Sequence, residues 1–316
     1  MPEQTYQYYL NQKTVAAHYL ELGNVSKALE HFINAYQTPF GIEDLDLMLE
    51  LAFLYDEVDE QKNAIQLFYD MIKLDPEFPT SYYGLATIYD DNEDYEKAIY
   101  YYKKTIELDP NYEAAHFFLA NIYDELGENE KAIYHYEKTI EIEPAYYYAY
   151  INLGCIYEAE DKNLKAYHYF YRAHQVDPAD YMALFNLGVA CRKLGQIKES
   201  IRYYRKSLNS NPEYSFTYLN LAILYKEVFE DYQESIALYT EGIKYNPEVS
   251  VLYYNRACCY ALLHENEKAL EDIKFSTQLS PSLIEYMKSI EEYYAVKTEY
   301  YEAIANKGVL DYLFKK

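Results

Sequence analysis

Residues 79–112, PTSYYGLATIYDDNEDYEKAIYYYKKTIELDPNY, and residues 113–146, EAAHFFLANIYDELGENEKAIYHYEKTIEIEPAY, are two copies of one 34-residue pattern. The repeat continues in both directions along the chain. Successive copies end at prolines that are 34 or 35 residues apart: Pro76, Pro110, Pro144, Pro178, Pro212, Pro247 and Pro281. A fixed period of this length is the sequence signature of a protein built from stacked structural repeats.

Each copy predicts two α-helices. A leucine and a small residue are followed by an aromatic residue, as in Leu119, Ala120 and Tyr123, and then by a small–aromatic pair, as in Ala132 and Tyr136. These spacings place the residues of each set on one face of a helix. The small residues let the two helix backbones approach, so the pattern indicates a helical hairpin.

Helix-ending residues separate these helices. Gly23, Gly127 and Gly195 lie where the first helix of a copy ends, a position at which a left-handed cap favours glycine. The recurring proline follows the second helix, which it cannot continue. The sequence therefore predicts an all-α stack of hairpins.

The pattern resembles the tetratricopeptide-repeat family, whose signature is a large residue, Leu-Gly/Ala and Tyr on the first helix, then Ala-x3-Phe/Tyr and Pro, in 34 residues. The resemblance implies a right-handed superhelical solenoid of about eight helix-turn-helix repeats over residues 1–283, with C-terminal capping helices at residues 284–316. The repeats are expected at 9–42, 45–78, 79–112, 113–146, 147–180, 181–214, 215–249 and 250–283.

Three repeats depart from the pattern. The first is irregular, because Pro39 comes one residue early and a short link follows it. The seventh holds one extra residue between Tyr225 and Ser235, which we expect in its turn. The eighth has Arg256 where the second to seventh have leucine.

Charge and motifs limit the functions that are compatible with this chain. Residues 1–180 carry 34 acidic and 12 basic residues (net −22), and residues 181–316 carry 18 and 16 (net −2). Such a polyanion repels nucleic-acid phosphates and anionic membranes, which favours a protein or peptide partner with a basic segment. The sequence has no secretion signal, no long apolar run and no metal-binding cysteine pattern, so we expect a cytoplasmic protein without cofactor or metal.

No motif predicts catalysis. Phosphate-binding glycine loops and HExxH are missing, and no Ser-His-Asp arrangement falls on one helix face. We therefore expect no enzymatic activity. The seven histidines are expected at the surface: His18, His31, His116, His135, His168, His174 and His264.

In the resembled family, the first helices line a concave groove through the second, fifth, sixth, ninth, twelfth and thirteenth positions of each repeat. The sixth position of the last four repeats is asparagine: Asn152, Asn186, Asn220 and Asn255. An asparagine side chain can donate to and accept from the main chain of an extended peptide, as a similar ladder does in the repeat domain of O-linked N-acetylglucosamine transferase. Local hydrogen bonding within the repeats is an equally good interpretation.

Other groove positions are charged or aromatic. The twelfth and thirteenth positions are acidic in the second, third and fourth repeats, at Asp56, Glu57, Asp90, Asp91, Asp124 and Glu125, and mostly basic in the sixth and seventh, at Arg192, Lys193 and Lys226. Aromatic anchors are expected at Tyr83, Phe117, Tyr148 and Phe185. This pattern favours a scaffold that binds a peptide segment in its groove. The alternatives are a self-associating structural protein, possible as a homo-oligomer, and a regulatory subunit of an enzyme complex.

Overall fold

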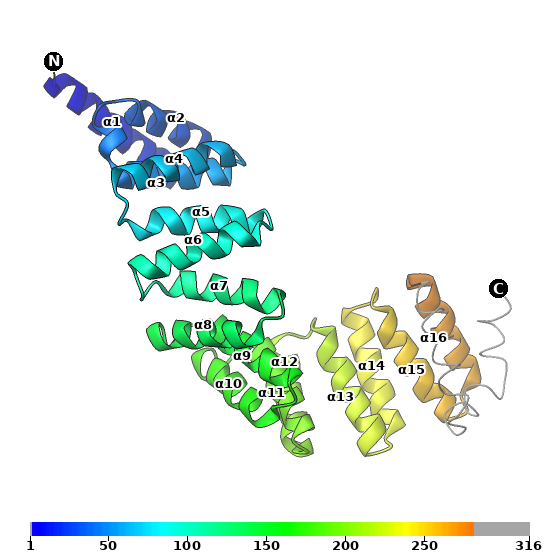
Figure 1. The fold of residues 1–316 in the computed structure, drawn as a ribbon. Coiled ribbons are helices and arrows are strands. Elements are labelled where there is room, and N and C mark those ends of the chain that lie inside the picture. The colour runs from blue at the N-terminus through cyan, green and yellow to red at the C-terminus, as the bar shows by residue number, and fades with distance from the viewer. Residues whose placement is uncertain (1, 281–316) are drawn as a thin grey trace. The chain divides into compact units, whose positions relative to one another are not determined.

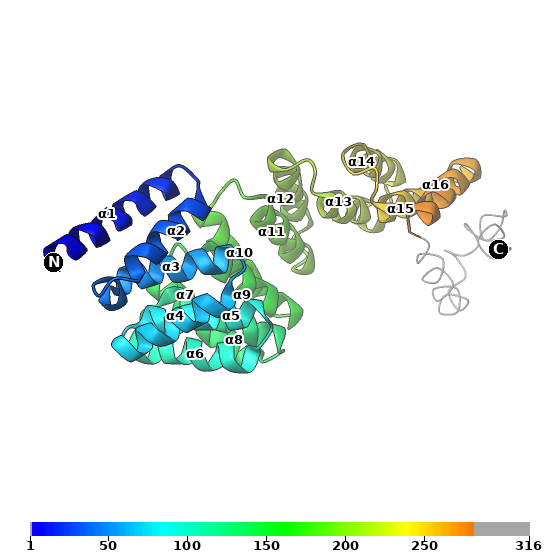
Figure 2. The same ribbon diagram turned by 90° about the horizontal axis from the view of Figure 1, so that it is seen from above.

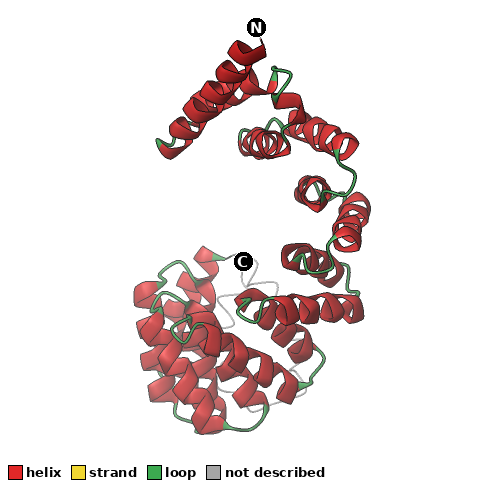
Figure 3. Cartoon of the chain, turned by 90° about the vertical axis from the view of Figure 1, so that its left-hand side faces the viewer, coloured by secondary structure: helices red, strands yellow, loops and turns green. Residues whose placement is uncertain are grey.

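The computed structural model describes residues 2–280, and within them it contains sixteen α-helices, one short 3₁₀ helix and no strand (Figures 1 and 3). This confirms the predicted all-α fold of paired helices. The expected capping helices at residues 284–316 lie outside the described residues. The α-helices are Pro2–Glu21 (α1), Val25–Tyr36 (α2), Leu45–Glu57 (α3), Gln61–Leu74 (α4), Pro79–Asp91 (α5), Tyr95–Leu108 (α6), Glu113–Glu125 (α7), Asn129–Ile142 (α8), Tyr147–Ala159 (α9), Asn163–Val176 (α10), Tyr181–Lys193 (α11), Ile197–Ser210 (α12), Ser215–Val228 (α13), Tyr232–Tyr245 (α14), Ser250–Leu262 (α15) and Asn266–Leu279 (α16).

The described residues form two compact units, which divide between Leu153 and Gly154. The first unit holds α1 to α8 with the start of α9, and the second holds the rest of α9 with α10 to α16. Within each unit, the two helices of a hairpin pack against each other and against the next hairpin. No helix between residues 2 and 280 is both long and apolar enough to cross a membrane.

The turn inside each hairpin uses the left-handed backbone region. Gly23, Gly127 and Gly195 have φ of 68°, 71° and 74°, which confirms their prediction as helix caps. Other hairpins reach the same region without glycine, with φ between 52° and 62°. A non-glycine residue in this conformation is strained by about 1 kcal/mol, and packing of the hairpin must offset that strain. These residues are Asp59, Glu93, Asp161, Glu230 and His264.

The structure corrects the position of the extra residue in the seventh repeat. Helix α13 has 14 residues, whereas α5 and α11 each have 13. Three residues then separate α13 from α14, as they separate α5 from α6. The extra residue therefore lengthens the helix and not the turn, and the ring of Phe229 packs on Tyr225 one helical turn earlier, 5.5 Å between centroids.

Tyrosine serves as a packing residue between the two helices of a hairpin. The rings of Tyr89 and Tyr101 stack at 5.6 Å, with Lys97 Nζ 4.6 Å from the centroid of the Tyr89 ring. Tyr157 and Tyr169 stack in the same way at 5.4 Å. Histidine replaces the second tyrosine in two other hairpins, in the pairs Tyr19–His31 and Tyr123–His135. Recurrence of this stack explains part of the 44-tyrosine content.

A second set of rings fills the core of each hairpin. Phe170 and Tyr204 are fully buried beneath Gly154 and Gly188, where an added Cβ would lie 2.3 Å and 2.5 Å from the respective ring. Close contact of ring and backbone explains why the first helix needs a small residue at this position. The equivalent buried rings elsewhere are Phe68, Tyr102, Tyr136 and Tyr239.

Candidate functional site

The first unit carries a row of carboxylates at the C-terminal ends of its first helices. We call Asp56, Asp90, Asp91, Asp124 and Glu125, from α3, α5 and α7, the acidic row. Helix α3 packs against α5, so the side chains of neighbouring repeats approach each other. None of the five carboxylates forms an ion pair with a residue between 2 and 280. Two accept a hydrogen bond from a tyrosine hydroxyl: Glu125 from Tyr95 at 2.6 Å and Asp90 from Tyr102 at 3.2 Å.

Burial and mutual repulsion disfavour the charged form of three carboxyls in this row. Burial raises the pKa of Asp90 to about 6, and repulsion by Asp91 and Glu125 adds to the rise, against the hydrogen bond from Tyr102. Burial and then Asp91 raise the pKa of Asp56, and burial and then Glu125 raise that of Asp124. The surrounding unit offers little compensation, because residues 1–153 carry 29 acidic and 9 basic residues, a net charge of −20. The row is therefore an unneutralised anionic surface.

Neutralising Asp90 should stabilise the protein at neutral pH. A carboxyl whose pKa is higher in the folded than in the unfolded state destabilises the fold when it is ionised. Asp90→Asn, which keeps an oxygen for Tyr102, is expected to raise the free energy of unfolding at pH 7 by about 1 kcal/mol. In urea titrations the gain should vanish below about pH 4, where Asp90 is protonated in both states. An equal gain at pH 7 and pH 3.5 would contradict this explanation.

The expected basic positions of the second unit are neutralised by their neighbours. Arg192 Nη2 lies 3.0 Å from Glu227 Oε2, and Lys193 Nζ lies 2.6 Å from Glu158 Oε1. Each of these pairs joins first helices of successive repeats. Lys226 has no ion-pair partner among the residues that the structure describes. Only this lysine, of the three predicted groove cations, keeps its charge available for a ligand.

The asparagine series makes local hydrogen bonds in three of its four members. Asn152 donates to the Tyr136 hydroxyl at 3.0 Å and to the Asn121 side chain at 3.2 Å. Asn220 and Asn255 each donate to a carbonyl of their own helix at 2.9 Å, those of Phe216 and Val251. Asn186 has no hydrogen bond within residues 2–280. Contact of the series with a peptide stays a prediction.

The aromatic candidates divide into covered and open rings. Phe117 is only 8% exposed and packs on Tyr136 and Tyr146. Tyr83 packs on Tyr112 and Phe185 on Tyr214, in each case the tyrosine just before the next repeat. Tyr148, in contrast, is 64% exposed. Of the four predicted anchors, Tyr148 has the largest surface free for a ligand.

The prediction that the histidines are surface residues is wrong for His116, which is only 3% exposed. Its Nε2 lies 3.2 Å from the Pro110 carbonyl, and its Nδ1 lies 3.0 Å from Nδ1 of His135. Because a carbonyl only accepts, Nε2 of His116 carries hydrogen, and in the neutral pair Nδ1 of His116 accepts from His135. The position of His116, six residues after the repeat proline, could have indicated its burial. In three other repeats a tyrosine at this position donates to the carbonyl of the repeat proline. The other pairs are Tyr82–Pro76, Tyr150–Pro144 and Tyr253–Pro247.

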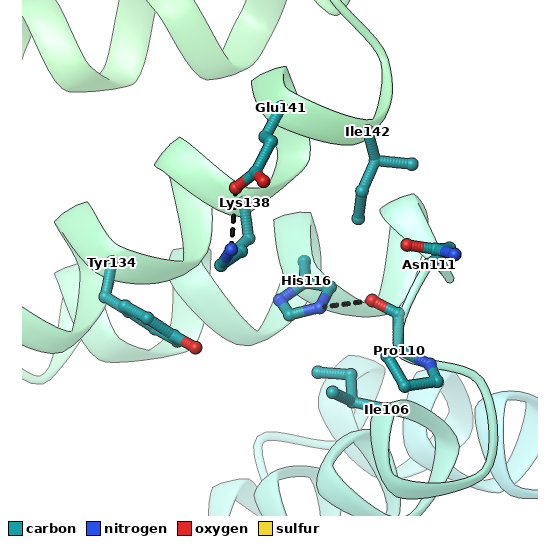
Figure 4. A pocket seen from close by; sticks show the side chains of 8 residues that line it. All are labelled: Ile106, Pro110, Asn111, His116, Tyr134, Lys138, Glu141 and Ile142. Atoms are coloured by element: carbon teal, nitrogen blue, oxygen red, sulfur yellow. Dashed lines mark hydrogen bonds and ion pairs between the residues drawn. The ribbon is translucent and has the colours of Figure 1, made fainter.

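His116 also lines a cavity of about 430 Å³ in the first unit (Figure 4). The Lys138 ammonium on its wall pairs with Glu141 at 2.6 Å, and both nitrogens of His116 are hydrogen-bonded. Lys138 and Glu141 thus pair with each other and His116 bonds to Pro110 and His135, so the lining of this cavity offers no free cation or base.

Comparison with known proteins identifies the repeat. Models of the tetratricopeptide repeat match residues 79–112, 113–146 and 181–214. No curated protein matches the chain.

Solved structures share the fold at low sequence identity. The C-terminal part of a TPR repeat-containing protein from Cytophaga hutchinsonii is 17% identical, with a TM-score of 0.61 over 74% of this chain and 95% of that one. PilF of Pseudomonas aeruginosa is 20% identical, with a TM-score of 0.55 over 68% and 97%. A chain of the APC/C hetero-tetramer Cut9-Hcn1 is 19% identical, with a TM-score of 0.51 over 81% and 50%. These matches show the shared fold, and the three matched repeats with the sixteen paired helices of residues 2–280 identify the chain as a stack of tetratricopeptide repeats.

Proposed function

We propose that the protein is a non-catalytic scaffold that captures a lysine- or arginine-rich segment of a partner protein along the acidic row. Tetratricopeptide repeats are protein-interaction modules, and this chain is a stack of them. The observation that carries the proposal is that five carboxylates on three successive first helices lack a cationic partner among residues 2–280.

A basic segment would relieve an unfavourable feature of the free protein. The raised pKa values of Asp56, Asp90 and Asp124 show that the negative charges there are poorly compensated. Bound ammonium or guanidinium groups favour the ionised carboxylates, so the repulsion present in the free protein becomes attraction in the complex. The net charge of −20 on the first unit would also attract a basic partner at long range.

The second unit, taken by itself, carries groups suited to main-chain contacts. The side-chain oxygens of Asn220 and Asn255 accept no hydrogen bond within residues 2–280, and Asn186 is unbonded. These groups can bind the N–H and C=O groups of an extended segment without reading its side chains.

The first test is binding of a fluorescent lysine octapeptide to the full chain. Asp90→Asn combined with Asp91→Asn should weaken binding about tenfold at low salt, because two contacts with the peptide are lost. Raising the ionic strength should weaken binding of the natural sequence as well. Lowering the pH from 7 to 5 should do the same, because Asp90, with a pKa of about 6, becomes protonated.

The matched control is Glu96→Gln with Glu130→Gln, two exposed carboxylates on the second helices α6 and α8. It changes the net charge equally and should leave the affinity within about twofold of the natural value. Equal weakening by both double variants would show a non-specific polyanion and would overturn the proposed role of the row.

A further inference from the structure

The first unit contains a second cavity, of about 320 Å³, between the first helices α1 and α3. Figure 2 shows α1, α2 and α3 at the N-terminal end of the unit. The inner part of the cavity is apolar, formed by Leu20 of α1, Phe32 of α2 and Leu47 of α3. Phe32 and Leu47 are buried, so this inner wall belongs to the core and is rigid.

Three carboxylates also line the cavity: Glu21 of α1 with Asp46 and Glu50 of α3. Asp46 and Glu50 form no ion pair within residues 2–280, and Glu21 Oε2 lies 3.8 Å from Nδ1 of the His18 imidazole. All three carboxylate residues are exposed. The lining thus combines a fixed apolar wall with unpaired negative charge.

The one lysine of the lining does not neutralise these carboxylates. Lys13 Nζ lies 2.6 Å from Asp44 Oδ2, and the Tyr9 hydroxyl donates to the same carboxylate oxygen. Although burial opposes it, these hydrogen bonds hold the pKa of Asp44 below its ordinary value. Asp44 therefore stays ionised and neutralises the charge of Lys13.

The carboxylates of this cavity and those of the acidic row hold related positions of the repeat. Glu21 holds the thirteenth position of the first repeat, and Asp46 and Glu50 hold the second and sixth positions of the second repeat. These are positions at which the sequence predicts ligand contact. Helix α3 carries both Glu50 of the cavity and Asp56 of the acidic row.

We propose that this cavity is an anchor pocket for one lysine or arginine side chain of the bound segment. The aliphatic stem would cover Leu20 and Leu47 while the cationic head meets the carboxylates, which is how long cationic side chains distribute themselves between apolar and charged surroundings. An uncharged aliphatic chain would leave the carboxylates uncompensated, and a small cation would leave the apolar wall uncovered. This inference rests on the proposed function, because it names the side chain that the scaffold recognises.

The direct test is NMR of the full chain with labelled alanine and leucine methyl groups. Titration with Nα-acetyl-lysine methylamide should shift the methyl signals of Ala17, Leu20 and Leu47, which line the cavity, and saturate. The norleucine counterpart, which lacks the charge, should bind at least about fivefold more weakly. Equal shifts with both compounds, or none at these methyls, would overturn the pocket.

Variants separate this inference from the proposed function. Glu50→Gln removes charge, and Ala17→Phe fills the cavity from an exposed position; each should weaken lysine-octapeptide binding about threefold to fivefold. Glu30→Gln, an exposed carboxylate on α2, should have no effect. If Asp90→Asn with Asp91→Asn weakens binding but both cavity variants bind normally, the proposed anchor pocket is wrong and the proposed scaffold function is not contradicted. If no variant weakens binding, both proposals fail.

Discussion

Replacing Asp272 by alanine is expected to destabilise the second unit by about 3–5 kcal/mol, because the change leaves a buried guanidinium without its counter-ion. Arg256 stands where the second to seventh repeats have leucine, and its side chain is only 15% exposed. Its Nε and Nη2 donate to the two Asp272 oxygens at 2.7 Å and 2.8 Å, and its Nη1 donates to Thr240 at 2.9 Å. The Asp272 side chain is 9% exposed, so water cannot replace it.

Urea unfolding monitored by circular dichroism measures the total loss, and hydrogen exchange of α15 and α16 localises it, since repeat stacks can unfold in parts. The matched control is the double change Arg256→Leu with Asp272→Leu, which restores an apolar pair. Because a buried ion pair is often no more stable than well-packed apolar residues, we expect the double variant to regain most of the lost stability. A loss below 1 kcal/mol for Asp272→Ala would show that the pair is not desolvated.

The helix pairs follow from the sequence because apolar spacing, small residues and helix-ending residues all agree in each repeat. Arg256 is different. The sequence shows that the leucine is missing, but its partner Asp272 lies sixteen residues away on the next helix. Only the packing of α15 on α16 brings the two together.

The candidate site was predicted unevenly for a similar reason. The position within the repeat correctly predicted that Asp90 and Asp91 lie at the end of a first helix. It did not predict that Glu227 and Glu158 neutralise Arg192 and Lys193. That neutralisation depends on residues 35 positions away, so comparison of adjacent repeats could have indicated it. Whether Phe117 is covered depends on Tyr146 of the following connection, which a pattern within one helix cannot show.

Acidification is expected to weaken the first unit through the His116–His135 pair. Burial lowers the pKa of His135 to about 4, with further contributions from His116 and Lys103, and burial lowers the pKa of His116. Because the unfolded imidazoles bind protons below about pH 6.5 and the folded ones resist, stability present at pH 7 should fall as the pH drops from 6.5 to 4. After allowance for partial exposure, we expect a loss of about 2 kcal/mol.

The carboxyls of Asp56, Asp90 and Asp124, whose pKa values are raised, contribute the opposite trend between pH 6 and 4, so the natural sequence alone cannot isolate the histidines. His116→Tyr provides the comparison, because Tyr82 and Tyr150 make the same bond to a repeat proline carbonyl. Tyrosine side chains in general ionise only near pH 10. Urea unfolding at pH 7 and at pH 4.5 should show a smaller acid loss in this variant. Identical losses in the two proteins would mean that His116 contributes nothing to the acid sensitivity, and would contradict the explanation.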